Sequence, residues 1–195
     1  MNTVTLTING QQVTANEGTT VLEAARSLGI DIPTLCAYDE LEPAGVCRLC
    51  MVEIKQGKKT RLVTSCVYPV ENGLEVQTET DRVNQNRRML LELLLPVAPS
   101  GPINALAKRY GVEKSRFELD GPKEAPTNCS LCGLCVRYCE QVKGEFVVGF
   151  TGRGVNRKVA LVAGKGDECA FCRQCYSICN SGRFVEMAEV FPDQP

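Results

Sequence analysis

The sequence predicts an α+β protein in which two cysteine-rich domains are joined by a helical connector. The prediction rests on an alternating strand pattern at the N-terminus, a leucine-rich helical stretch in the middle, and a cysteine motif that occurs twice near the C-terminus. A chain of 195 residues is long enough for one or two such domains. The expected boundaries are residues 1–78 for the first domain, 79–120 for the connector and 121–195 for the second domain.

Composition and charge restrict the classes of function. The chain has 12 cysteines and no histidine, and its net charge at pH 7 is −1, with acidic and basic residues interspersed. This pattern gives no indication of nucleic-acid or membrane binding. The most apolar run, residues 89–97, is too short to span a bilayer, and no secretory signal is evident. We therefore expect a cytoplasmic protein, in which so many cysteines indicate metal or redox chemistry rather than disulfides.

The N-terminal domain begins with a predicted strand–turn–strand–helix unit. Asn9-Gly10 predicts a hairpin turn between two strands. The helix that follows can be capped by Thr19 or Thr20 and is expected to end at Gly29. The predicted elements of this domain are strand 3–8, strand 11–14, a helix within 17–29, and strands 51–54, 62–66 and 74–78.

The C-terminal domain is dominated by the repeated cysteine motif. Residues 129–139 and 169–179 both have the pattern C-x2-C-x2-C-x3-C, and each cysteine of the second copy lies 40 positions after its counterpart. This spacing resembles that of bacterial ferredoxins with two four-iron (4Fe-4S) clusters, in which the last cysteine of each motif ligates the other cluster. The resemblance implies two crossed ligand sets: Cys129, Cys132, Cys135 with Cys179, and Cys169, Cys172, Cys175 with Cys139.

Two other interpretations of these eight cysteines fit the spacing less well. Structural zinc sites usually combine two C-x2-C pairs across a longer loop, whereas each motif here is a triple run with a trailing cysteine. Disulfides are disfavoured because the closely spaced thiols of such a motif do not define one bridge.

Four further cysteines follow the N-terminal helix with the spacing C-x10-C-x2-C-x15-C. Together with the strand pattern they resemble a β-grasp ferredoxin domain with one two-iron (2Fe-2S) cluster, although plant-type ferredoxins have a first gap of only four residues. Small residues such as Ala44 and Gly45 allow close wrapping of this loop, so that backbone N–H groups can point at the sulfurs. A zinc site is the alternative, because one C-x2-C pair with two distant cysteines also occurs in zinc folds. The expected ligands are Cys36, Cys47, Cys50 and Cys66.

The connector is predicted to contain two helices. Thr78-Glu-Thr-Asp81 fits a capping box for a helix that runs to about Leu95, and the second half of this helix is apolar almost all round, which is typical of a buried helix. It either packs the cluster domains together or also contacts another subunit. A shorter helix is expected at residues 103–110, ended by Gly111.

Three features remain in the C-terminal domain. Gly152 and Gly154 lie in a predicted turn, and they do not complete a dinucleotide-binding fingerprint. Arg173 replaces the glycine that is common between the second and third cysteines of such motifs. The other expected elements are a rigid linker at 121–126 and strands at 145–150, 157–162 and 183–187.

The ordered combination of motifs covers nearly the whole chain. It resembles the N-terminal region of the large iron–sulfur subunit of complex I, and the iron–sulfur subunits of NAD(P)-linked hydrogenases and formate dehydrogenases. The additional cluster motif of complex I, with one histidine and three cysteines, is absent because the chain has no histidine. The resemblance implies one 2Fe-2S cluster and two 4Fe-4S clusters, which together use all 12 cysteines.

The resemblance also implies a role without an active site on this chain. The subunit would relay single electrons between an NAD(P)H-oxidising flavoprotein subunit and a hydrogenase, formate dehydrogenase or ferredoxin-linked subunit. A free, diffusible polyferredoxin is the rival hypothesis, but diffusing carriers benefit from a strong field of one sign, and the net charge here is −1. A zinc-bound assembly scaffold is a third class, which would be colourless.

Overall fold

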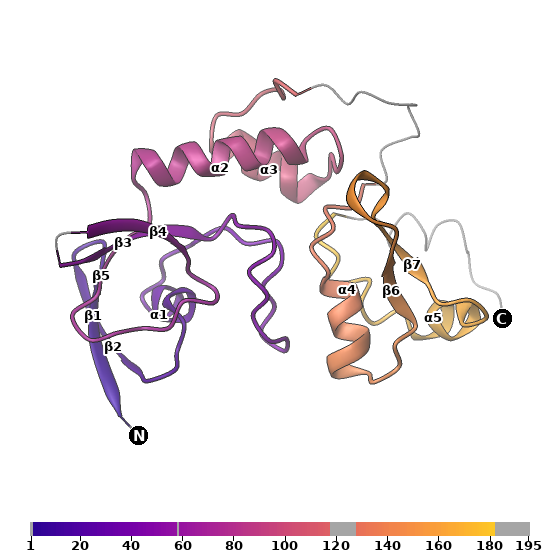
Figure 1. Cartoon of the computed structure of the whole chain (residues 1–195), viewed down its shortest axis with the longest axis horizontal. Helices are drawn as coiled ribbons and strands as arrows, with labels where there is room; N and C mark the ends of the chain where they lie inside the picture. The colour runs from indigo at the N-terminus through magenta and orange to yellow at the C-terminus, as the bar shows by residue number, and fades with distance from the viewer. Residues whose placement is uncertain (1, 58, 118–127, 182–195) are drawn as a thin grey trace. The chain divides into compact units, whose positions relative to one another are not determined.

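The computed structural model describes residues 2–57, 59–117 and 128–181 (Figure 1). The chain folds as two compact units, of which unit 1 comprises residues 1–37 and 43–90, and unit 2 comprises residues 38–42 and 91–195. The predicted linker and the predicted strand 183–187 lie outside the described residues. The predicted domain boundaries stay a prediction. Within the described segments, no helix has the length and apolar character needed to cross a bilayer.

Unit 1 is built on one mixed sheet of five strands. In chain order they are β1 (Thr3–Ile8), β2 (Gln11–Asn16), β3 (Met51–Gln56), β4 (Lys59–Thr64) and β5 (Glu75–Gln77). The β1–β2 hairpin turns at Asn9 and Gly10, whose φ angles of 50° and 82° suit a two-residue loop between twisted strands. The spatial order is β2-β1-β5-β3-β4, with β5 parallel to β1 and antiparallel to β3. The turn at Gly73 therefore leads into β5 in the middle of the sheet, and β5 does not pair with β4, the strand that precedes it in the sequence.

Helix α1 (Val21–Ser27) supplies the other half of the unit 1 core. Its N-cap is Thr20, whose hydroxyl accepts from the Glu23 N–H at 3.2 Å, while a Glu23 carboxylate oxygen accepts from the Thr20 N–H at 2.7 Å. This capping box satisfies two of the free N–H groups at the start of the helix. The core combines apolar side chains of the helix with inward-facing residues of the strands: Leu6, Ile8, Val21, Leu22, Ala24, Ala25, Val52, Ile54 and Val76.

Helix α2 (Asp81–Leu94) differs from its prediction in two respects. Its first N–H groups are capped by the Thr80 hydroxyl, which accepts from Val83 N–H at 3.2 Å, because the Thr78 hydroxyl instead accepts from the Asn9 side chain. The predicted capping box at Thr78 is therefore wrong. The helix is also not buried all round: it buries one stripe, whereas two of its apolar side chains are about half exposed. The buried stripe is Val83, Arg87 and Leu91, and the exposed side chains are Met89 and Leu93.

Unit 2 contains short elements around the two repeated motifs. In chain order they are α3 (Gly101–Arg109), α4 (Leu134–Arg137), a π-helical turn (Tyr138–Val142), β6 (Val148–Thr151), a 3-10 turn (Gly154–Asn156), β7 (Lys158–Leu161) and α5 (Gly166–Cys172). Strands β6 and β7 pair antiparallel. β7 lies within its predicted range, whereas β6 begins later than predicted and extends one residue beyond position 150. A Cβ atom on Gly152 would lie 2.2 Å from the Asn156 carbonyl oxygen, so the turn between the strands requires glycine for steric reasons.

Unit 2 also includes the short segment 38–42, which follows Cys36 in the sequence. The Tyr38 ring packs edge-on against Tyr138, with the ring centroids 6.4 Å apart. An Arg137 Nη atom donates to the Glu42 carbonyl at 2.7 Å, and the Glu42 N–H donates to the Gln141 side chain at 3.2 Å. The segment is thus held by the helical turns that surround Cys139.

Candidate metal centres

The four cysteines of unit 1 converge in one site. Cys36, Cys47 and Cys50 lie in the irregular chain between α1 and β3, and Cys66 lies just after β4 rather than inside it as predicted. Three of them are buried and Cys47 is half-buried. Thiols of Cys47 and Cys66 hydrogen-bond to the Cys36 sulfur, and Cys66 also bonds to Cys50. The structure therefore brings together all four residues that the spacing singles out.

Backbone N–H groups also point at these sulfurs. The Leu35 N–H donates to the Cys47 sulfur and the Cys47 N–H donates to the Cys36 sulfur, both at 3.4 Å. The hydrogen bond from the Cys47 thiol, followed by that from Cys66, lowers the pKa of Cys36 to about 2. The Cys66 thiol lowers the pKa of Cys50 to about 7. The same hydrogen bonds, that to Cys36 above all, raise the pKa of Cys47 and of Cys66. The site therefore favours the thiolate, the form that binds iron, at Cys36 and Cys50 but not at Cys47 and Cys66.

The backbone around Cys50 is fixed by hydrogen bonds from two sides. The Ser65 hydroxyl donates to the Cys50 carbonyl at 2.7 Å. Arg87 on α2 donates to the carbonyls on either side, Leu49 and Met51, each at 3.1 Å. We did not predict a role for Arg87. The signal that could have found it is its place at helical spacing between two buried apolar residues of α2.

In unit 2, one small pocket is lined by a crossed set of cysteines: Cys129, Cys132, Cys135 and Cys179. Burial is the main cause that raises the pKa of Cys132 and of Cys135 above the ordinary thiol value. The charges of the other cysteines of the set raise both values further. Four thiolates in this pocket would repel one another unless a positively charged group neutralised them.

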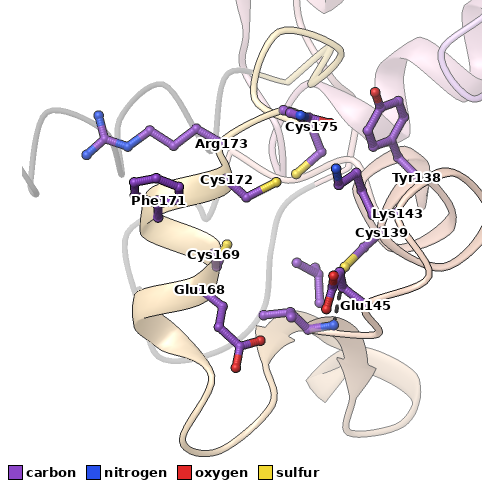
Figure 2. Close-up of a pocket in the computed structure, with 13 residues that line it drawn as sticks. Tyr138, Cys139, Lys143, Glu145, Glu168, Cys169, Phe171, Cys172, Arg173 and Cys175 are labelled. Atoms are coloured by element: carbon purple, nitrogen blue, oxygen red, sulfur yellow. Dashed lines mark hydrogen bonds between the residues drawn. The ribbon is translucent and has the colours of Figure 1, made fainter.

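The other crossed set lines a second cavity of about 430 Å³, and its members are Cys139, Cys169, Cys172 and Cys175. Figure 2 shows sulfur atoms from both motifs facing a common space. The Val147 N–H donates to the Cys139 sulfur at 3.2 Å. Burial, with smaller contributions from the neighbouring cysteines, raises the pKa of Cys175 to about 12. Cys172 is the exposed member of this set, so one side of the cavity opens to solvent.

The two motifs place their cysteines differently with respect to the helices around these pockets. Helix α4 already begins at Leu134, because Gly133 takes a left-handed conformation with φ 76° and turns the chain into the helix. Cys139 lies further along, in the π-helical turn. In the second motif Cys169 and Cys172 lie within α5, not in a loop. The two copies thus use helix and loop differently around equivalent cysteines.

The described cysteine sets do not form a site for a single metal ion. None of the 12 cysteines, all of which lie in described segments, forms a disulfide. Across residues 2–57, 59–117 and 128–181, no three cysteine, aspartate or glutamate side chains lie close enough together to hold a single metal ion.

Comparisons with known proteins match the N-terminal part of the chain to a family and most of the chain to larger relatives. Residues 1–81 match the family model of the 2Fe-2S iron-sulfur cluster binding domain. The NADPH-Fe(3+) oxidoreductase subunit alpha of Geobacter sulfurreducens is 32% identical over 213 residues, which cover 98% of this chain and 25% of that protein. The mitochondrial NADH-ubiquinone oxidoreductase 78 kDa subunit of Candida albicans is 28% identical over 215 residues, which cover 98% of this chain and 30% of that protein. The chain therefore spans less than a third of the length of either relative.

A solved structure matches a larger share of its own chain. A chain of the crystal structure of an NAD+-reducing NiFe hydrogenase in the H2-reduced state superposes with a TM-score of 0.71 and 31% identity, over 84% of this chain and 76% of that one. These matches confirm an α+β fold with an N-terminal 2Fe-2S ferredoxin-like domain. They also confirm the predicted resemblance to complex I and to hydrogenases. The chain belongs to the family of iron–sulfur electron-transfer subunits found in NAD(P)H-linked oxidoreductases.

Proposed function

We propose that this chain holds one 2Fe-2S cluster in unit 1 and two 4Fe-4S clusters in unit 2, and relays single electrons within an NAD(P)H-linked oxidoreductase complex. The observation that carries the proposal is that two separate pockets of unit 2 are each lined by four cysteines, three from one motif and one from the other. A chain that used each motif for its own site would bring four consecutive motif cysteines together instead. The crossed arrangement is typical of two-cluster ferredoxins.

The residues of each site fit the needs of iron–sulfur clusters. Such clusters, when bound, accept and release one electron at a time and are held by thiolates. The raised pKa values of Cys135 and Cys175 show that burial alone would keep these thiols protonated. These thiols would lose their protons on binding iron, whose positive charge would offset that cost. In unit 1 the N–H groups that point at sulfur stabilise negative charge on the sulfur atoms even without iron.

The proposed partners follow from the chemistry of nicotinamides. A hydride donor delivers two electrons together, whereas an iron–sulfur cluster takes one, so a flavin must stand between them. The sequence has no flavin or dinucleotide fingerprint. We therefore place an NAD(P)H-oxidising flavoprotein subunit on one side of this chain. On the other side we expect a catalytic subunit such as a hydrogenase, or a ferredoxin-linked subunit, in a cytoplasmic complex.

Metal and sulfide analysis of the anaerobically purified chain tests the cofactor assignment. One two-iron and two four-iron clusters amount to about ten irons per chain, with acid-labile sulfide in similar amount. Stoichiometric zinc without sulfide would contradict the proposal. Recovery of the chain in stable association with a flavoprotein supports the subunit role, and its recovery as a monomer that exchanges freely between partners would favour the diffusible polyferredoxin.

A further inference from the structure

Arg87 is an unusual residue to find in the core of unit 1. It is on α2, between the buried side chains Val83 and Leu91, and its side chain is 0% exposed. Burying a guanidinium is costly unless its hydrogen bonds are satisfied. An apolar residue at this position would continue the buried stripe of the helix. Arginine at this position is therefore stable only if its hydrogen bonds offset the cost of burying its charge.

The hydrogen bonds of Arg87 are directed at the cysteine-bearing chain. Its Nε atom donates to the Leu49 carbonyl and an Nη atom donates to the Met51 carbonyl, both at 3.1 Å. The other Nη atom donates to the Glu79 carboxylate at 2.9 Å. Both carbonyls flank Cys50, so one planar guanidinium fixes the backbone on each side of this proposed ligand. A lysine ammonium cannot match the fixed fork that reaches both carbonyls.

Arg87 and its carboxylate partner differ in their exposure to solvent. Glu79, its carboxylate partner, has a side chain that is 46% exposed, so water screens the negative charge more than the positive one. A buried positive charge therefore lies beside the segment of Cys50. Such a charge would favour negative charge on the sulfur of Cys50, the residue between the two carbonyls that Arg87 contacts.

We propose that Arg87 is a positioning residue that fixes the Cys50 segment and raises the reduction potential of the two-iron centre, and that Glu79 acts in the opposite direction. This inference rests on the proposed 2Fe-2S cluster of unit 1. One electron from the redox partner makes a centre with four thiolate ligands more negative by one charge, and no bond or proton is exchanged. The buried guanidinium stabilises that extra charge, so reduction becomes more favourable.

Redox titration of the full chain, loaded with clusters under anaerobic conditions, tests the proposal. The two-iron centre is followed by its EPR signal at temperatures where four-iron signals have relaxed away. In Arg87→Gln we expect reduction to become about tenfold less favourable, a fall of about 59 mV for a one-electron couple. In Glu79→Gln the potential should rise. Arg87→Lys keeps the charge, so its potential should stay near that of the wild type while its cluster is lost faster on heating.

Arg82→Gln is the matched control, because this arginine is on the same helix with a side chain that is 57% exposed and pairs with Glu53 at 3.5 Å. Solvent screens its charge, so its removal should move the potential far less. The proposal is overturned if Arg87→Gln shifts the potential no more than Arg82→Gln, or if Arg87→Lys lowers it as much as Arg87→Gln. If the Arg87→Gln chain does not retain the 2Fe-2S cluster, the Glu79→Gln variant decides. A potential in Glu79→Gln equal to that of the wild type then overturns the proposal.

Measurements on the wild-type chain distinguish failure of the proposed 2Fe-2S cluster from failure of the proposed role of Arg87. If it gives no 2Fe-2S signal, the proposed function of unit 1 fails. If it gives the signal and the variants leave its potential unmoved, only the role of Arg87 fails.

Discussion

Gly133 and Arg173 occupy equivalent positions, directly after the second cysteine of their motifs, and both adopt a left-handed backbone, with φ angles of 76° and 48°. The two copies of the motif therefore turn in the same way although only one of them has glycine. For a residue with a Cβ atom this conformation costs about 1 kcal/mol. Arg173 compensates in part, because its Nε atom donates to the Ala170 carbonyl at 2.6 Å.

The left-handed backbone at Arg173 gives the first prediction. Arg173→Gly and Arg173→Ala both lose the side-chain hydrogen bond, but only glycine relieves the backbone strain. We expect the glycine variant to be more stable than the alanine variant by about 1 kcal/mol. Denaturant unfolding of the cluster-loaded chains under anaerobic conditions measures the difference. In ordinary helix or extended positions alanine is the more stable residue, so the reverse order would contradict the conformation described.

Gly133→Ala is the companion variant in the first motif. It introduces the same strain, and its Cβ atom would also lie 3.3 Å from the Phe150 ring. We expect a loss of about 1–2 kcal/mol in the same unfolding measurement. A stability equal to that of the wild type would show that the two turns are not equivalent.

Local signals in the sequence predicted much of unit 1. The Asn9-Gly10 turn needs two positive φ angles, which these neighbouring residues permit. A cap at Thr19 or Thr20 is predicted, and Thr20 forms it together with Glu23, three residues later. The position of β5 is different. It pairs with β3 and with β1, where Thr7 lies opposite Glu75, 75 − 7 = 68 positions later in the chain. No local pattern specifies which edge a strand joins.

The parts of the candidate sites that the sequence did not predict have similar causes. Thr78 and Thr80 both fit an N-cap, and the choice between them depends on Asn9, which is distant in sequence. The burial of Arg87 is not evident from composition because charged side chains are rarely buried unless paired, and two of its partners are backbone carbonyls, which any residue type supplies. The grouping of the cysteines, by contrast, is implied by the resemblance of both motifs to two-cluster ferredoxins, and the cysteines that line each unit 2 pocket are those of one implied set.

The crossed ligand sets give the second prediction, which pairs of substitutions can test. If Cys139 and Cys172 serve the same cluster, the double variant Cys139→Ser with Cys172→Ser should lose about four irons, no more than either single variant. The double variant Cys139→Ser with Cys132→Ser should lose about eight, because it removes a ligand from each cluster. Iron and sulfide analysis after anaerobic purification gives these numbers.

A matched pair completes that experiment. Cys179→Ser with Cys132→Ser should again lose about four irons, since both residues line the smaller pocket. Loss of about four irons from the Cys139–Cys132 pair, together with about eight from the Cys139–Cys172 pair, would mean that each motif holds its own cluster.

Separation of the cluster types is the third prediction. A fragment ending at Ser100 keeps the five strands, α1, α2 and the four cysteines of unit 1. It loses the unit 2 contacts of residues 38–42, including that between Tyr38 and Tyr138. We expect about two irons and a 2Fe-2S EPR signal from this fragment. A four-iron cluster in the folded fragment would contradict the ligand assignment.

The last prediction concerns the source of electrons. Because the sequence has no flavin or dinucleotide fingerprint, the isolated chain should not be reduced by NADH or NADPH at a useful rate. Dithionite, which delivers single electrons, should bleach at least part of its visible absorption. Addition of the cognate flavoprotein subunit should make bleaching by a reduced nicotinamide rapid, which stopped-flow absorption can measure.

Single-cluster variants then show whether the route through the chain is a line. Cys36→Ser, Cys132→Ser and Cys172→Ser each remove a ligand from a different proposed cluster, so in a linear route each should block transfer through the complex. In a branched route one of the three variants would transfer electrons nearly as fast as the wild type. Rapid bleaching by NADH alone, in a preparation free of flavin, would contradict the electron-relay role itself, because a hydride would then be accepted on a chain that has no group to receive it.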